Sequence, residues 1–254
     1  MSERIYVRHP NSPDRSIKLP IIYNDDLCIA LSKPANFPCK GEQFSILEQI
    51  WAGLQKPFMG RLDLEHPDVV YNLEDSASGI LLIAKNKEAT KILKNAYGSY
   101  LFEFTFDLLC EKSSRNKEAE IACSLPIAHH TSREVMLISA KMGKKSYTAF
   151  NFIESANRYE RWQAKCTYLR RDQICLHAHE SGLAVLGDGK YGGAQIPLFA
   201  ELKRNFKANR KKNNEFPYSG SMVHLSILKL HDGTIIHSEL PKKMHTFMKF
   251  LENP

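Results

Sequence analysis

An acidic turn runs into an apolar segment in the stretch Leu73-Glu74-Asp75-Ser76-Ala77-Ser78-Gly79-Ile80-Leu81-Leu82-Ile83-Ala84. The unbroken apolar run over residues 80–84, which ends at Lys85, predicts a buried strand. Carboxylates and small residues directly before a strand are typical of a turn that exposes an acid where active sites are commonly built. An ordinary Asp, Ser and Gly loop has the same composition. The stretch therefore predicts a strand and leaves the role of its turn open.

Strand patterns dominate the rest of the chain. Phe102, Phe104 and Phe106 alternate with polar residues, which predicts a half-buried strand over 100–109. The turn Asn24-Asp25-Asp26 predicts a hairpin over 21–31, and a last hairpin is expected over 222–240. Further strands are expected at 134–139, 147–153, 161–168 and 173–177, and helices at 45–54, 87–97 and 242–251. Without regular strand-helix alternation, the fold class expected is α+β, with a mixed, largely antiparallel central sheet and flanking helices.

Two terminal segments differ from the rest in composition. Residues 1–18 are polar and contain Pro10 and Pro13, which predicts an N-terminal tail or a strand-like addition, and residues 19–254 are expected to form one domain. A basic segment at 198–214 has apolar residues at helical spacing, as in an amphipathic helix or arm. Such a segment is either a solvated helix face or a contact surface for the RNA backbone. Its cations are Lys203, Arg204, Lys207, Arg210, Lys211 and Lys212.

Composition and charge exclude several classes of protein. A hydrophobic content of 43% excludes wholesale disorder, and the apolar runs are far shorter than the roughly 20 residues of a membrane helix. The amino terminus has no apolar run typical of a secretory signal. Six cysteines without a Cys-x-x-Cys pair argue against a zinc site or a disulfide framework and favour the cytoplasm. The net charge of +7, of which +5 lies in residues 200–254, favours a polyanionic partner.

Several motifs, taken in chain order, resemble the RluA-type family of RNA pseudouridine synthases. The matching segments are Tyr23-Asn24-Asp25-Asp26 with Lys33-Pro34, residues 71–79 with Ala84-Lys85, Tyr100-Leu101-Phe102, residues 169–177 and residues 187–192. The resemblance covers about residues 19–251. The Gly-Asp-x-x-Tyr-Gly segment at 187–192 is its most specific intact part.

The resemblance implies a cleft across the sheet, conversion of uridine to pseudouridine in structured RNA, and no metal or cofactor. A uridine would be flipped out of the RNA, with basic residues holding the backbone. The family's catalytic aspartate falls on Glu74. The substrate-binding positions fall on Asn72, Phe102, Arg171, Gln173 and Cys175.

This sequence departs from the family pattern at those positions. Glu74 keeps the negative charge but adds a methylene, and a misplacement of about 1 Å costs on the order of a hundredfold in rate. Asn72 replaces an arginine, and Phe102 replaces a tyrosine and loses its hydroxyl. Cys175 replaces the arginine that pairs with the aspartate, and Asp172 replaces a histidine. A carboxylate without its arginine is expected to be a poor nucleophile.

Other residues were weighed for catalytic or metal-binding roles. Asp75 follows Glu74 directly but points elsewhere in the family frame. Asp63, in a sequence like the family's His-Arg-Leu-Asp, lacks the Ser-Gly that should follow it. His177 and His179 would share one face of the expected strand, yet no third metal ligand is visible, so no metal site is predicted.

Three functions follow from these residues. The favoured one is an RNA-binding protein of this family, such as an assembly factor, that keeps the cleft and the basic flank without catalysis. The first alternative is an active pseudouridine synthase that uses Glu74, and the second is a small-molecule enzyme in a repurposed cleft. For both RNA functions the expected partner is structured ribosomal or transfer RNA. The protein is expected to be a monomer that does not associate with membranes.

Overall fold

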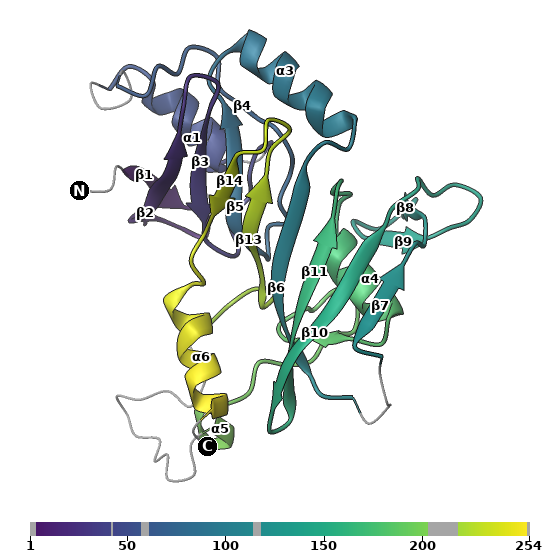
Figure 1. Ribbon diagram of the computed structural model, residues 1–254. Helices are drawn as coiled ribbons and strands as arrows, with labels where there is room; N and C mark the ends of the chain where they lie inside the picture. The colour runs from purple at the N-terminus through teal and green to yellow at the C-terminus, as the bar shows by residue number, and fades with distance from the viewer. Residues whose placement is uncertain (1–3, 42, 57–60, 114–117, 203–217, 253–254) are drawn as a thin grey trace. The chain divides into compact units, whose positions relative to one another are not determined.

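The computed structural model describes residues 4–41, 43–56, 61–113, 118–202 and 218–252 (Figure 1). The chain divides into two compact units, where the sequence predicted one domain over 19–254. Unit 1 consists of Met1–Phe106, Lys165–Arg171 and Leu225–Glu239, and unit 2 consists of Asp107–Ala164, Asp172–His224 and Leu240–Pro254. Each unit is described separately below.

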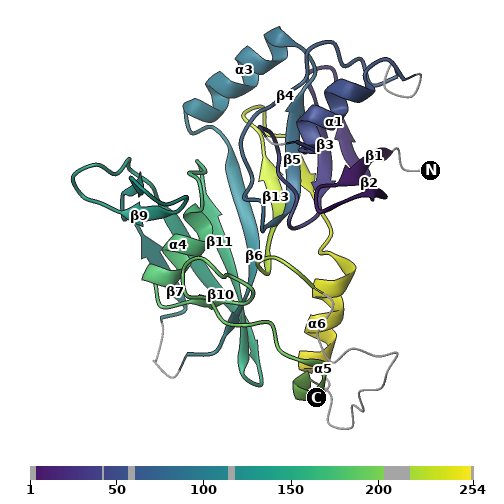
Figure 2. The same ribbon diagram turned by 180° about the vertical axis from the view of Figure 1, so that it is seen from behind.

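Unit 1 is built on a largely antiparallel sheet. Its strands lie in the order β1 (Arg4–His9), β2 (Ser12–Asn24), β3 (Cys28–Lys33), β5 (Ser78–Ala84) and β13 (Val223–Lys229), of which the last belongs to this unit from Leu225 onward. The short strands β4 (Asp68–Val69) and β14 (Ile235–His237) pair with β5 and β13. Helix α1 (Ile46–Gly53) contacts β1, and helix α3 (Lys87–Gly98) contacts β4 and β5, as both views show (Figure 2). This arrangement places the acidic turn at the start of the buried strand β5.

Unit 2 contains a second group of strands. They follow the order β6 (Glu103–Glu111), β11 (Tyr159–Cys166), β10 (Thr148–Ala156) and β7 (Glu120–Cys123), and β12 (Ala184–Val185) pairs with β6. The first four residues of β6 and the last two of β11 belong to unit 1. The strands β8 (Ile127–His129) and β9 (Met136–Ile138) form a separate hairpin. The helices of this unit include α4 (Gln173–Glu180), α5 (Phe199–Leu202) and α6 (Lys242–Glu252). The α+β class and its largely antiparallel sheet are therefore confirmed.

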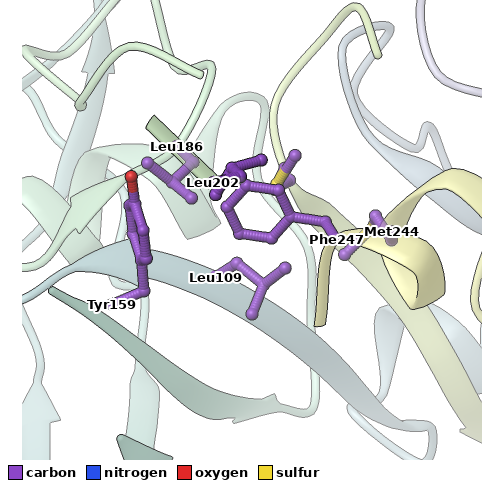
Figure 3. Close-up of a cluster of buried hydrophobic side chains, with 7 residues drawn as sticks. Leu109, Tyr159, Leu186, Leu202, Met244 and Phe247 are labelled. Carbon is purple, nitrogen blue, oxygen red and sulfur yellow. The ribbon is translucent and has the colours of Figure 1, made fainter. Parts of the chain in front are cut away.

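Each unit has its own buried apolar cluster. In unit 1 the rings of Tyr71 and Phe104 meet edge to face, with centroids 4.9 Å apart. In unit 2, helix α6 contributes Met244 and Phe247, and the Phe247 ring lies edge-on to Tyr159 at 5.4 Å. Figure 3 shows this cluster, which consists of Leu109, Tyr159, Leu186, Leu202, Met222, Met244 and Phe247.

Many predicted elements are confirmed, and their local chemistry explains them. The hairpin of β2 and β3 turns at Asp25, whose Oδ1 accepts hydrogen bonds from the backbone N–H groups of Leu27 at 2.8 Å and Cys28 at 2.7 Å. Helix α1 begins after Ser45, whose hydroxyl accepts from the Glu48 N–H at 3.4 Å. A side-chain acceptor at this position satisfies one of the unpaired amides of a helix start.

One prediction about local structure is resolved and another is corrected. Of the two alternatives for residues 1–18, the strand-like addition holds over residues 4–18, where β1 and the first half of β2 form a hairpin that buries the alternating Ile5 and Val7. Residues 173–177 are not a strand but the first turns of α4, in which every residue from 173 to 178 is buried. A short apolar run does not distinguish a buried helix from a strand by periodicity.

Candidate functional site

The acidic turn is closed by its own backbone and tied to β5. The N–H of Ala77 donates to the carbonyl of Glu74 at 3.1 Å. The hydroxyl of Tyr71, which is buried, donates to the carbonyl of Ile80 at 2.7 Å. Asn72 lies between these anchors and is exposed. The turn is thus fixed on the side where it enters the sheet, with polar side chains left toward the surface.

The acids differ in exposure. Glu74 is half-buried, whereas Asp75 and Asp63 are exposed. Asp63 adopts a left-handed backbone conformation, with φ at 50°, in a separate turn. Of the three, only Glu74 is partly shielded from solvent. Its assignment to the family's aspartate position stays a prediction.

A buried lysine joins the acidic turn to the end of β3. Lys33 is 1% exposed, and its Nζ donates to three backbone carbonyls. The acceptors are Phe37 at 2.9 Å, Asp75 at 3.1 Å and Pro34 at 3.2 Å. Three acceptors match the three hydrogens of an ammonium group. Lys33 therefore acts as a brace between the loop after β3 and the turn that carries Glu74.

Two further bonds join the same two loops. The thiol of Cys39 donates to the Leu73 carbonyl at 3.2 Å, and the N–H of Phe37 donates to the Asp75 carbonyl at 3.2 Å. Burial raises the pKa of Cys39 to about 11, so the group is a thiol at neutral pH. Burial also lowers the pKa of Lys33 below its usual value, and Cys39 and the acidic turn oppose that shift.

Gly79 ends the turn at a point of close contact. Its φ is 125°, a conformation that side chains of L-residues rarely adopt. A Cβ atom at Gly79 would lie 2.4 Å from the carbonyl oxygen of Leu225 in β13. The turn can enter the sheet here only because the residue lacks a side chain.

Phe102, the residue at the family's tyrosine position, is fully buried in unit 1. The centroid of its ring lies 6.0 Å from that of Tyr97 and 6.2 Å from that of Phe104. The imidazole of His231 stacks on it at 6.3 Å and an interplanar angle of 24°. The contact of Phe102 with a substrate stays a prediction. Its contacts with the rings of Tyr97, Phe104 and His231 show that it packs in the core of unit 1.

Arg170 and Arg171 end the last segment of unit 1 before residue 172. The guanidinium of Arg170 lies 4.7 Å from the ring centroid of Tyr168, and Tyr168 stacks on Tyr97 at 4.4 Å with an angle of 10°. Arg171 is exposed. A cation over an aromatic face gains an electrostatic attraction that helps to fix the side chain. The stack thus orders the backbone that leads into α4.

Asp172, at the family's histidine position, has a new set of partners in unit 2. Its carboxylate is buried and accepts from the Tyr191 hydroxyl at 2.8 Å and from the Lys190 ammonium at 3.2 Å. The Tyr191 oxygen also accepts the N–H of Met136 at 2.9 Å. Asp172 therefore ties the start of α4 to the segment 187–192. The sequence did not predict this link, although both motifs were recognised.

Gln173 and His177 share a buried polar network. The Gln173 amide donates to the Tyr147 carbonyl and to the Thr148 hydroxyl, both at 3.0 Å. Nε2 of His177 lies 2.9 Å from the Leu125 carbonyl, and Nδ1 lies 2.9 Å from the Thr148 hydroxyl. Because a carbonyl only accepts, Nε2 carries the proton and Nδ1 accepts from Thr148. The network accounts for His177 as a neutral structural residue.

Stability is expected to fall as the pH drops below about 6.5 because of His177. Burial lowers the pKa of its imidazole, so the unfolded chain binds the proton first and is favoured in acid. Full stability is present above the unfolded pKa. Urea unfolding at several pH values should show a weaker acid dependence in His177→Gln. The exposed His179 offers a matched control, and an equal effect of His179→Gln would contradict the assignment.

The two histidines do not share a face, which corrects the sequence prediction. They lie two residues apart on helix α4, and such positions point to different sides of a helix. No group of three or more His, Cys, Asp or Glu residues that could hold a metal is found among the described residues. Nor is any described helix long and apolar enough to cross a membrane.

The predicted site residues are distributed over both units. Asn72, Glu74, Phe102 and Arg171 belong to unit 1, and Gln173 and Cys175 belong to unit 2. Cys175 is 2% exposed in α4. The predicted cations of the basic segment, Lys203, Arg204, Lys207, Arg210, Lys211 and Lys212, lie outside the described residues.

One residue of the site was missed in the sequence analysis. Lys33 was recognised only as part of the Lys33-Pro34 motif that ends a hairpin. Its apolar surroundings were the available signal, because a lysine directly after the buried run 28–31 must find acceptors inside the protein. The acceptor at Asp75, about 40 residues away, could not be predicted from the sequence.

Comparison with known proteins relates the chain to enzymes that modify RNA. No family model matches. Over 207 residues the chain is 25% identical to "Ribosomal large subunit pseudouridine synthase D" of Haemophilus influenzae, covering 76% of this chain and 60% of the relative. It is 28% identical over 182 residues to "Ribosomal large subunit pseudouridine synthase C" of Rickettsia conorii, covering 71% and 59%. The chain thus spans about three-fifths of the length of these relatives.

A shorter relative and two solved structures agree with this. "Dual-specificity RNA pseudouridine synthase RluA" of Vibrio parahaemolyticus is 25% identical over 189 residues, covering 71% of this chain and 72% of the relative. The structure "Human RNA Pseudouridylate Synthase Domain Containing 4" aligns with a TM-score of 0.68 at 13% identity, covering 91% and 92% of the two chains. "Human RNA Pseudouridylate Synthase Domain Containing 1" aligns with a TM-score of 0.57 at 16% identity, covering 93% and 95%. These structural likenesses concern the fold.

Proposed function

The chain belongs to the RluA-type family of RNA pseudouridine synthases, and we propose that within this family it is an RNA-binding protein that does not isomerise uridine. The proposed partner is a structured ribosomal or transfer RNA, bound by a monomer in the cytoplasm without metal or cofactor. The printed names of the relatives support the choice of RNA. All six cysteines are buried thiols outside any disulfide, which fits a reducing compartment.

The observation that carries this proposal is the identity of two residues. Glu74 occupies the position of the catalytic aspartate, and its extra methylene displaces the carboxylate from the place where the family's acid would act. Displacements of about 1 Å cost on the order of a hundredfold in rate. Because the turn is braced by Lys33 and closed by the Ala77 bond, its backbone has little freedom to compensate.

The second residue is Cys175. The resemblance implies that an arginine at this position pairs with the catalytic acid, and an arginine beside a carboxyl lowers its pKa and keeps it charged. Cys175 cannot supply that charge, and it is buried in α4. The acid and its partner are thus both altered, and both changes act against catalysis.

Binding of RNA has separate support in charge. The chain carries a net charge of +7, and the basic segment 198–214 holds six cations. Contacts between cations and phosphates release counterions, which makes the affinity fall as salt rises. The proposal therefore predicts RNA binding that is strongly dependent on salt.

Tritium release from RNA labelled at uridine C5 tests the loss of catalysis. Ribosomal and transfer RNA transcripts are incubated with the unmodified protein, Glu74→Asp and Glu74→Ala. No release above background is expected from any of them, because Glu74→Asp restores the acid but leaves Cys175 uncharged. The same RNAs should bind all three proteins equally. Release by the unmodified protein that is lost in Glu74→Ala would overturn the proposal.

An active synthase that uses Glu74 is the second candidate, and one observation favours it. The turn keeps a carboxylate and is held by several bonds, as expected of a turn whose acid must be positioned. The tritium assay decides between the two candidates. A small-molecule enzyme would be favoured instead if none of the RNAs bound.

A further inference from the structure

The N-terminal hairpin of unit 1 presents a basic and aromatic face to solvent. Along β1 the side chains of Arg4, Tyr6 and Arg8 are exposed, while the alternating Ile5 and Val7 are buried. Alternate residues of a strand point to opposite faces of the sheet. The hairpin therefore divides cleanly into an apolar side that packs on the unit and a side that carries cations and a ring.

Strand β2 adds to the same face. Tyr6 lies opposite Lys18, and Arg8 lies opposite Ser16 in the antiparallel register, so these pairs share a face. The Lys18 ammonium lies 6.0 Å from the centroid of the Tyr6 ring. Tyr6 is 60% exposed, which is unusual for a large aromatic side chain and leaves much of its ring open to stacking.

The charge of the hairpin is strongly positive. Residues 4–20 contain four cations and a single acid, Asp14, which gives a net charge of +3. Arg8 and Lys18 take part in none of the ion pairs found among the described residues. Cations without acidic partners attract a polyanion more strongly than cations already neutralised by a neighbour.

A cavity of about 890 Å³ opens beside this face. Its walls come from the hairpin, from residues 41, 43 and 44, and from α1 and the residues just after it. They include Tyr6, Arg8, Phe44, Glu48 and Lys56. This volume lies in the upper part of the range of about 300–1,000 Å³ that is typical of ligand sites. The cavity joins two aromatic rings and two cations within one unit.

The cavity is held open by a specific clamp. The Gln49 side-chain amide bonds both backbone groups of Arg8, accepting from its N–H and donating to its carbonyl at 3.0 Å. The same amide donates to the Phe44 carbonyl at 2.6 Å. Gln49 thus fixes α1, β1 and Phe44 around the cavity without using the Arg8 side chain, which stays available to a ligand.

The acids of the cavity limit where phosphates can lie. Asp14 and Glu48 line the wall together with Arg8 and Lys56, so the interior carries no net charge. A phosphate is favoured on the outer side, near Arg8 and Lys18, and an uncharged base is favoured inside. Carboxylates can accept hydrogen bonds from the amino groups of bases. This distribution suits a strand whose bases turn inward and whose backbone remains outside.

We propose that the exposed face of the β1–β2 hairpin and the adjoining cavity bind a single-stranded segment of RNA. A base stacks on Tyr6, and the neighbouring phosphates contact Arg8 and Lys18. Aromatic stacking combined with a cationic track is the usual means of holding single strands without sequence preference. This inference rests on the proposed RNA-binding function and assigns it a contact surface remote in sequence from the acidic turn.

Fluorescence anisotropy with a labelled single-stranded oligouridylate tests the hairpin site. Tyr6→Ala is expected to weaken binding about tenfold through lost stacking. Arg8→Gln is expected to weaken it severalfold and to reduce the salt slope by about 0.7 for one lost phosphate contact on a single strand. Each variant has a matched control. Tyr6→Phe keeps the ring, and Arg15→Gln removes the same charge from the residue before Ser16, and Arg15 does not line the cavity.

The outcomes separate this inference from the proposed function. Equal losses in Arg8→Gln and Arg15→Gln would show a general charge effect and overturn the site. Binding of structured RNA by the unmodified protein that is unchanged in Tyr6→Ala and Arg8→Gln would also overturn it, and would leave the proposed function standing. Failure of the unmodified protein to bind any RNA would overturn both. Photocrosslinking to an oligomer that contains 4-thiouridine should label peptides within residues 4–18, and labelling confined to other peptides would contradict the site.

Discussion

Alanine in place of Gly79 is expected to lower the free energy of unfolding by about 3 kcal/mol or more. Backbone strain at a φ of 125° costs of order 1–3 kcal/mol for a residue with a side chain. The new Cβ would also lie 2.4 Å from the Leu225 carbonyl, and overpacking of this kind costs typically about 1–3 kcal/mol. Neither β5 nor β13 can move aside, because both are paired on either side within the sheet.

Gly233→Ala provides the matched control for this experiment. Gly233 lies in the same unit and has a φ of 89°, but a Cβ there would meet no atom within 4 Å. It tests the backbone strain alone, for which about 1–2 kcal/mol is expected. Urea unfolding of both variants measures the difference. Equal losses would show that the approach of Leu225 contributes nothing.

Gly79 also illustrates what the sequence could predict of the site. The apolar run 80–84 and the small residues before it correctly indicated a buried strand preceded by a turn. The reason for a glycine at the end of the turn was not readable, because Leu225 lies far along the chain. Close approach between distant segments depends on the tertiary structure, whereas periodicity reports only local structure.

The errors of the sequence analysis have a similar origin. The run Gln173 to His177 was assigned to a strand but forms a helix whose polar side chains bond inward to Thr148 and Leu125. Because the whole run is buried, it has no apolar and polar faces from which a helical period could be recognised. The hairpin at the N-terminus was only one of two alternatives, because its polar face masked the alternation of Ile5 and Val7. In both cases the secondary structure depends on tertiary packing, which the local sequence pattern does not report.

The family resemblance matched the segments 169–177 and 187–192, which Asp172 and Tyr191 join by a hydrogen bond of 2.8 Å. It did not predict that Asp172, at the position of the family's histidine, would make this link. The roles that the resemblance gives to Glu74, Gln173 and Cys175 stay predictions.

Lys33→Met is expected to lower the free energy of unfolding by about 1–3 kcal/mol, because buried backbone carbonyls lose the donor that they bond in the native protein. Methionine preserves the volume of the side chain but donates no hydrogen bond. The carbonyls of Pro34, Phe37 and Asp75 would remain buried with one fewer donor. An unsatisfied buried acceptor costs about 1–3 kcal/mol.

A buried charge can often be replaced by an apolar residue without loss, so the direction of this effect needs a reason. Such replacements succeed when both partners become apolar together. Here the partners are backbone carbonyls, which no substitution removes. The Asp75 carbonyl keeps the Phe37 N–H as a donor, but the carbonyls of Pro34 and Phe37 lose the ammonium that they accept from. Lys40→Met removes an exposed charge from the same unit and should change stability by less than about 0.5 kcal/mol.

Urea unfolding compares the two lysine variants, and amide hydrogen exchange locates the effect. The N–H groups of Phe37 and Ala77, which close the two braced loops, should exchange faster in Lys33→Met than in Lys40→Met. Equal stability of the two variants would show that the ammonium does not hold the turn. Because both acid and brace belong to one unit, this result bears directly on Glu74. A turn that loosens when Lys33 is removed is one whose carboxylate position is set by the fold, and the added methylene of Glu74 then cannot be absorbed by the backbone.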